Sequence, residues 1–124
     1  MDQPQGFMQD LSLVYRLKKS LCGLKQAPRA WYAKMDFYLL SLKFVRCKSD
    51  LNVYMLRIVD SLLLLVLYVD DLLITGCSTS MIVVVKRILH ERISMTDMGP
   101  LHFFLGLEIS QDASGIKLFQ AKYA

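Results

Sequence analysis

The chain has 124 residues, of which 54% are hydrophobic, so it can bury one core and forms one domain or part of one. Its three cysteines, at positions 22, 47 and 77, form no CxxC pair, which argues against a disulfide framework and against a zinc site. The first ten residues, MDQPQGFMQD, contain two acids and lack the basic and apolar regions of a signal peptide. We therefore expect an intracellular protein, cytoplasmic or nuclear. The longest apolar run, residues 62–69, is eight residues, far below the roughly 20 that a membrane helix needs, so no membrane association is expected.

Positive charge is concentrated in the first part of the chain. Residues 1–50 hold nine Lys and Arg against four Asp and Glu, whereas residues 51–124 hold six against seven. The aromatic residues Tyr15, Trp31 and Tyr32 lie among these basic residues. This composition allows two interpretations, a surface that binds phosphates and stacks bases, or a solvated basic face with aromatic core residues beneath it.

The first half of the chain predicts one helix and several strands. Residues 13–17 alternate like a short strand, and SLCGLKQAPR at 20–29 indicates a turn. Apolar residues at helical spacing then predict a helix over 29–43. The apolar runs 52–59 and 61–69 predict a hairpin around Asp60, and 72–75 a third strand.

The second half predicts a further helix and two strands. Ser78, Thr79 and Ser80 are candidate N-caps for a helix whose apolar positions are 82, 85, 89 and 93, although MIVVV alone is typical of a strand. After the break at Gly99 and Pro100, residues 105–110 and 116–119 predict two strands joined by a turn at 111–115. The expected fold class is α+β.

Two adjacent carboxylates, Asp70 and Asp71, interrupt the most apolar stretch, LLLLVLYVDDLLITG at 62–76. Burying them unpaired would cost several kcal/mol or more, so a position at the tip of a hairpin is expected. There they serve turn chemistry alone, or they hold a cation such as Mg²⁺, which prefers oxygen ligands and leaves positions open for phosphates. Two-metal phosphoryl transfer uses such a cluster.

Longer motifs point to a family. YVDD at 68–71 resembles the catalytic box of reverse transcriptases. In the same order and spacing, QPQGF at 3–7, LKKSLCGLKQAPRAWY at 17–32, TDMGPLHFFLGLEI at 96–109 and FQAKYA at 119–124 resemble the polymerase of copia-type LTR retrotransposons. The resemblance covers essentially the whole chain. It implies part of a polymerase palm, an antiparallel sheet with about two packed helices and a YVDD hairpin.

The resemblance also implies roles for individual residues. Asp70 and Asp71 match the aspartates that hold Mg²⁺ or Mn²⁺ in the complete enzyme, which extends a primer with deoxynucleotides. The residues implied near the nucleotide are Cys22, Gly23, Leu24, Tyr68 and Val69. Those implied near an RNA/DNA primer-template are Lys18, Lys19, Lys25, Gln26, Pro28 and Arg29. Local alternatives stay open: Gly23 as a plain turn, Pro28 as a helix start and Arg29 as a solvent-exposed charge of the first helical turn.

The resemblance predicts a partial reverse transcriptase domain over residues 1–124. In the family, the first carboxylate box with a third metal-binding Asp lies just before the QPxGF segment, so it is expected to be absent here, as are the fingers, thumb and ribonuclease H regions. Cys22 also stands where Tyr is usual, and Thr96 where Lys is frequent. Two hypotheses follow: a fragment of an RNA-dependent DNA polymerase, or an inert retrotransposon-derived remnant that acts at most as a nucleic-acid or protein-binding module.

Overall fold

The computed structural model describes residues 2, 5–6, 10, 12–19, 21 and 23–120. The chain divides into two compact units, Met1–Ile82 and Val83–Ala124. We describe each unit by itself.

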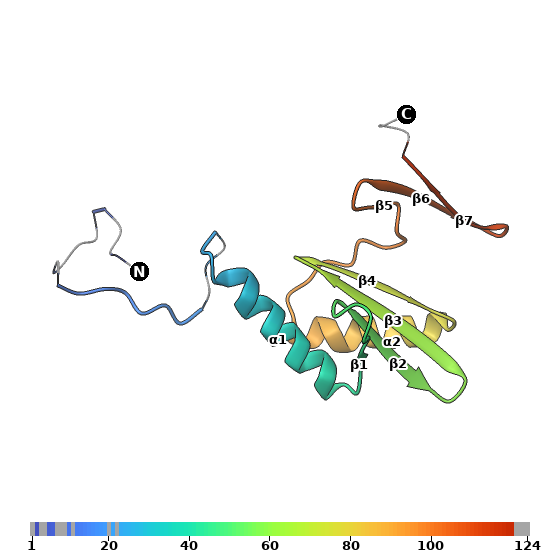
Figure 1. Ribbon diagram of the computed structural model, residues 1–124, viewed down its shortest axis with the longest axis horizontal. Helices are drawn as coiled ribbons and strands as arrows, with labels where there is room; N and C mark the ends of the chain where they lie inside the picture. Colours follow the sequence, from blue (N-terminus) through green and yellow to red (C-terminus); the bar gives the residue numbers. More distant parts are fainter. Residues whose placement is uncertain are drawn as a thin grey trace. The chain divides into compact units, whose positions relative to one another are not determined.

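The first unit is built on a four-stranded antiparallel sheet with the order β1-β2-β3-β4 (Figure 1). Its strands are β1 (Val45–Arg46), β2 (Val53–Ile58), β3 (Ser61–Tyr68) and β4 (Asp71–Gly76), and helix α1 (Ala27–Ser41) precedes them. Each strand pairs with its neighbour in sequence. Ile58 pairs with Ser61 and Tyr68 with Asp71, so two-residue turns connect β2 to β3 and β3 to β4. The hairpin predicted around Asp60 is confirmed.

Helix α1 begins and ends two residues earlier than the predicted range 29–43. Pro28 lies in its first turn, where the missing amide hydrogen costs no helical bond. The helix ends at Ser41 because Lys43 adopts a left-handed conformation with φ 69°, which stops the helical hydrogen-bond series. Met35 and Leu39, one turn apart, are fully buried.

The core of the first unit follows the alternation of β3. Leu63, Leu65 and Leu67 are buried on one face of this central strand. Tyr54 of β2 is directly opposite Leu65 and is also fully buried. The continuous leucine run therefore forms a central strand that is covered on the face bearing these three leucines, while its alternate residues are half-buried.

The predicted second helix is confirmed as α2 (Thr79–Arg92), which crosses the boundary between the two units. Ser78 caps its start, because its hydroxyl accepts a hydrogen bond from the Met81 amide at 3.4 Å. Its apolar positions Val85 and Leu89 are buried, as is Ile93 just after its end. The helical spacing of these residues therefore outweighs the strand propensity of MIVVV.

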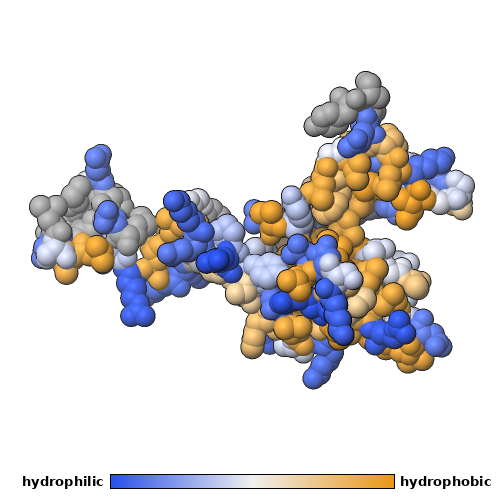
Figure 2. All heavy atoms as spheres, viewed as in Figure 1, coloured by the Kyte–Doolittle hydropathy of each residue, from blue (hydrophilic) through white to orange (hydrophobic). Residues whose placement is uncertain are grey.

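The second unit contains a three-stranded antiparallel sheet with the order β5-β6-β7. Its strands are β5 (Phe103–Phe104), β6 (Leu107–Asp112) and β7 (Gly115–Phe119). Leu105 and Gly106, with φ 52° and 79°, form the turn before β6, so the strand predicted over 105–110 begins two residues later. The space-filling view in Figure 2 shows hydrophobic side chains at the surface of this unit, where Ile116 and Leu118 are exposed.

One strand expected from the sequence is absent, and two observed strands were not expected. Residues 13–17 form no strand, since this segment pairs with none of the described strands. Strands β1 and β5 were not predicted, because two residues are too few to show an alternation.

Among the described residues, no helix combines the length and the apolar character needed to cross a membrane.

Candidate functional site

The turn between β3 and β4 carries the YVDD residues. Tyr68 ends β3 and pairs with Asp71, the first residue of β4, so Val69 and Asp70 are the two loop residues. All four are exposed. The expected tip position therefore applies to Asp70, while Asp71 already belongs to the sheet.

Val69 has an unusual backbone conformation. Its φ is 51°, in the left-handed region that Gly, Asn and Asp tolerate far better than a β-branched residue. Such a conformation costs about 1–3 kcal/mol and persists only where the surrounding structure imposes it. The β2–β3 turn repeats the situation, because Val59 has φ 52° and is also followed by an aspartate.

Helix α1 contacts the Val69–Asp70 turn directly. The indole nitrogen Nε1 of Trp31 donates a hydrogen bond of 2.9 Å to the carbonyl oxygen of Val69. Trp31 is half-buried in the second turn of α1. Sequence reasoning offered Trp31 as a stacking or a core residue, and neither interpretation included this bond between residues 38 positions apart.

A polar cluster around Tyr54 fixes α1 on the sheet. Tyr54 donates to a carboxylate oxygen of Asp36 at 2.8 Å, and Arg46 forms an ion pair with the same carboxylate. The guanidinium of Arg46 also lies over the Tyr54 ring, 5.8 Å from its centroid. The hydroxyl of Tyr32 donates to the Leu51 carbonyl at 3.0 Å. These contacts join the middle of α1 to β1, to β2 and to the loop between them.

The cluster shifts the pKa values of its members. The hydrogen bond from Arg46 holds the pKa of Asp36 below its ordinary value, and the bond from Tyr54 acts in the same direction. Burial raises the pKa of the Tyr54 phenol, and its hydrogen-bonded neighbours Tyr32 and Asp36 raise it further. Asp36 therefore carries a negative charge at neutral pH, and Tyr54 stays protonated as its donor.

The carboxylates of Asp70 and Asp71 are suitable ligands for a hard cation. Both are exposed, and within the described part of the chain no hydrogen-bond or ion-pair partner contacts either one. Carboxylate oxygens are the donors that Mg²⁺ and Mn²⁺ prefer. The described residues contain no group of three or more His, Cys, Asp or Glu side chains that could hold a metal ion.

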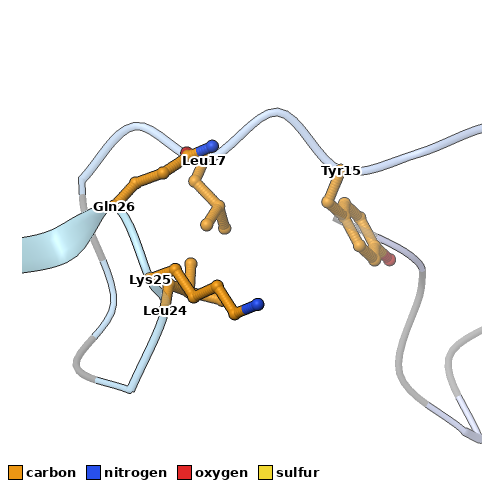
Figure 3. Close-up of a pocket in the computed structure, with 5 residues that line it drawn as sticks. All are labelled: Tyr15, Leu17, Leu24, Lys25 and Gln26. Atoms are coloured by element: carbon orange, nitrogen blue, oxygen red, sulfur yellow. The ribbon is translucent and has the colours of Figure 1, made fainter.

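A second group of predicted residues lines a hollow of about 500 Å³ just before α1 (Figure 3). Leu24, Lys25 and Gln26 form one side and the extended segment bearing Tyr15 and Leu17 forms the other. The hollow is open to solvent, and its wall combines three apolar or aromatic residues with one cationic and one amide side chain.

The other predicted residues lie around this hollow. Gly23 has φ 93°, a conformation that favours glycine, so the turn by itself accounts for a glycine at this position. Pro28 starts α1, while Lys18, Lys19 and Arg29 are exposed and lie outside the lining. Cys22 falls outside the described residues.

Helix α1 connects the two groups of predicted residues. It begins directly after Gln26 of the hollow, and its second turn brings Trp31 to Val69. Among the described residues, no side-chain hydrogen bond or ion pair links the hollow to the two aspartates themselves.

Comparison with known proteins covers the whole chain. A family model described as reverse transcriptase (RNA-dependent DNA polymerase) matches residues 1–124. The chain is 40% identical over 125 residues to the retrovirus-related Pol polyproteins from transposons RE2 and RE1 of Arabidopsis thaliana, with 99% of this chain and 9% or 8% of those proteins covered. It is also 40% identical over 128 residues to the retrovirus-related Pol polyprotein from transposon TNT 1-94 of Nicotiana tabacum, with 99% and 10% covered.

These matches confirm the predicted resemblance to the polymerase of copia-type retrotransposons. The chain spans a tenth or less of the length of these polyproteins. No solved structure matches it. The chain belongs to the reverse transcriptase (RNA-dependent DNA polymerase) family.

Proposed function

We propose that this chain forms part of a reverse-transcriptase active centre in which the β3–β4 turn holds divalent cations for nucleotide addition to a primer. One observation carries the proposal: two adjacent carboxylates, exposed and without a partner among the described residues, lie at the end of the central hairpin of a chain that belongs to this family. Asp70 and Asp71 are the proposed cation ligands.

When bound, Mg²⁺ or Mn²⁺ would activate the attacking oxygen of a primer and stabilise the leaving oxygen of a deoxynucleotide. The residues of the chain would hold the cations and position the primer end and the nucleotide. Asp70 in the turn and Asp71 in β4 offer oxygens from adjacent residues. Tyr68 and Val69, both exposed beside them, are proposed to lie against the primer end and the incoming nucleotide.

The segment before α1 is proposed to receive nucleotide and template. The hollow lined by Leu24, Lys25 and Gln26 offers an apolar wall and one positive charge, which suits a base and a phosphate. Lys18 and Lys19 are exposed close by in sequence and add cationic contacts for a nucleic-acid backbone. The exposed Arg29 and the first turn of α1 at Pro28 extend this basic surface.

The alternative, an inert remnant that acts at most as a nucleic-acid or protein-binding module, is not favoured by a family match across residues 1–124. The two hypotheses differ in what a single aspartate does. In an active centre Asp70 is essential, whereas in a binding module its charge opposes the binding of nucleic acid.

The chain offers its own control for the test, since Asp60 has the same position in the β2–β3 turn that Asp70 has in the β3–β4 turn. Residues 1–124 replace the matching segment of the TNT 1-94 polyprotein, and primer extension on an RNA template is measured with Mg²⁺ or Mn²⁺. We expect Asp70→Asn to reduce extension by about a hundredfold or more, because cation-held charge stabilisation is worth several kcal/mol. Asp60→Asn leaves it unchanged. Equal extension by the Asp70→Asn chimera and its parent would overturn the proposal.

A second measurement tests the basic segment. Binding of the chain to an RNA/DNA duplex is expected to weaken steeply with added salt, because each phosphate contact releases counterions. Replacing Lys18, Lys19 and Lys25 by Gln should lower both the affinity and the slope of this salt dependence. Indifference to salt and to these substitutions contradicts the role proposed for the segment.

A further inference from the structure

Strand β3 is bounded by two Val-Asp turns in which the valine has nearly the same φ. Val59 and Asp60 connect β2 to β3, and Val69 and Asp70 connect β3 to β4. The two valines have φ 52° and 51°, so both occupy the left-handed region that a β-branched side chain disfavours. The Val-Asp dipeptide and the φ of its valine therefore do not distinguish the two turns.

A single hydrogen bond does distinguish them. The Trp31 indole donates to the Val69 carbonyl at 2.9 Å, whereas no described side chain donates to the carbonyl of Val59. The donor is fixed in place, because the neighbouring Tyr32 binds the Leu51 carbonyl and Asp36, one turn further along α1, binds Tyr54.

We infer that Trp31 is a positioning residue for Asp70. Its indole N–H holds the Val69 carbonyl, and with it the peptide plane that leads directly into Asp70. Without this bond, the Val69–Asp70 peptide plane is held by the two-residue turn alone, as the Val59–Asp60 plane is, so it tilts more freely and the Asp70 carboxylate moves with it. The inference rests on the proposed cation role of Asp70, and the test below separates the two.

The test is solution NMR on the full chain, comparing Trp31→Phe with the parent. A residue with φ near 50° gives a strong intraresidue NOE between its amide and Hα protons, so Val69 reports on the turn and Val59 serves as an internal reference. Mn²⁺ broadens amide signals near its site, which reports on cation binding at Asp70. We expect the Val69 NOE to stay, because Val59 keeps the same φ without such a bond, and the Mn²⁺ affinity to fall about fivefold, the effect of losing one neutral hydrogen bond.

Two further variants separate positioning from general stability. Tyr32→Phe removes the neighbouring hydrogen bond of the same helix, so it should lower stability without changing the Val69 NOE or the Mn²⁺ affinity. Val69→Gly loosens the same turn, so with Trp31 in place it should also lower the Mn²⁺ affinity. Val59→Gly loosens the other turn and should leave the Mn²⁺ affinity unchanged.

The outcomes are distinct. An unchanged Mn²⁺ affinity in Trp31→Phe, with binding lost in Asp70→Asn, overturns the inference and leaves the proposed function intact. Absence of Mn²⁺ broadening at Asp70 in the parent chain overturns the cation role, and exchange of the Trp31 indole proton with solvent then decides alone whether Trp31 holds the turn. If Trp31→Phe does not fold, hydrogen exchange of the indole proton in the parent chain tests the inference instead, because the single tryptophan gives one indole signal. Slow exchange of that proton with solvent supports the inference, and unprotected exchange overturns it.

Discussion

Gly76 ends β4 at a point where the backbone of β3 leaves no room for a side chain. A Cβ atom built on Gly76 would lie 2.8 Å from the carbonyl oxygen of Leu62 and 3.2 Å from the Cα of Leu63. Both are backbone atoms of the central strand, so they cannot move aside as the end of a flexible side chain can. The same Leu62 oxygen accepts a hydrogen bond from the Cys77 amide at 3.2 Å. Gly76→Ala should therefore force β3 and β4 apart at this end.

Two opposing effects set the size of the change. Overpacking against a fixed backbone costs about 1–3 kcal/mol. Alanine also restricts the unfolded chain more than glycine does, which stabilises the fold by about 0.4–1 kcal/mol where the native φ is compatible, as it is at Gly76. The clash is the larger effect, and we expect the free energy of unfolding to fall by about 1–2 kcal/mol.

Urea unfolding of the full chain measures this change. With a slope of about 1–3 kcal/mol per M, the midpoint should move down by about 0.3 to 2 M. Cys77→Ala is the control, because this exposed neighbour makes no such approach and should shift the free energy by less than about 0.5 kcal/mol. A midpoint for Gly76→Ala equal to or above that of the parent chain would refute the close approach of β4 to β3.

The polar side chains of the first unit give three further predictions. The pairing with Arg46 lowers the pKa of Asp36 in the folded chain, so the ionised carboxylate stabilises the fold. This stabilisation is complete above the ordinary pKa of about 3.9 and is lost as the pH falls through the lower folded value. Asp36→Asn should remove this part of the pH dependence of the urea midpoint. Tyr54→Phe should lower the free energy of unfolding by about 1 kcal/mol, and an unchanged midpoint contradicts the bond to Asp36. The backbone amide of Ser49 lowers the pKa of the Cys47 thiol, so alkylation of Cys47 should begin at lower pH in the folded chain than in urea; equal profiles contradict this.

The sequence predicted the parts of the fold in which one periodicity persists over a whole element. The leucine run of β3 and the helical spacing in α2 are long enough to outweigh local ambiguity. The pairs Val45–Arg46 and Phe103–Phe104 are too short for any period, and only their partner strands make them strands. Residues 13–17 show the reverse case, because an alternating pattern without a partner strand remains extended chain.

The polar contacts of the site were harder to predict than its carboxylates. Asp70 and Asp71 stand out because acids are rare within apolar runs. Trp31 and Tyr54 give no such signal, since an aromatic residue at a helical or strand position is ordinarily a core residue. Their hydrogen bonds join residues 38 and 18 positions apart, and no local pattern encodes a partner at that distance.

The two Val-Asp turns show that neighbouring residues are enough to predict this part of the fold, whereas the site depends on residues far apart in the sequence. Asp60 and Asp70 each follow a valine in the left-handed region and each occupies a two-residue turn, so short-range sequence predicts the same hairpin twice. What makes them unequal comes from elsewhere in the chain: the second turn is followed by another aspartate, and its backbone is held by a tryptophan from α1. A dipeptide at the end of a strand is enough to make a turn. Whether that turn presents a carboxylate in one fixed position depends on the helix that reaches it, which is why mutations in α1 should affect the behaviour of Asp70 while leaving Asp60 unchanged.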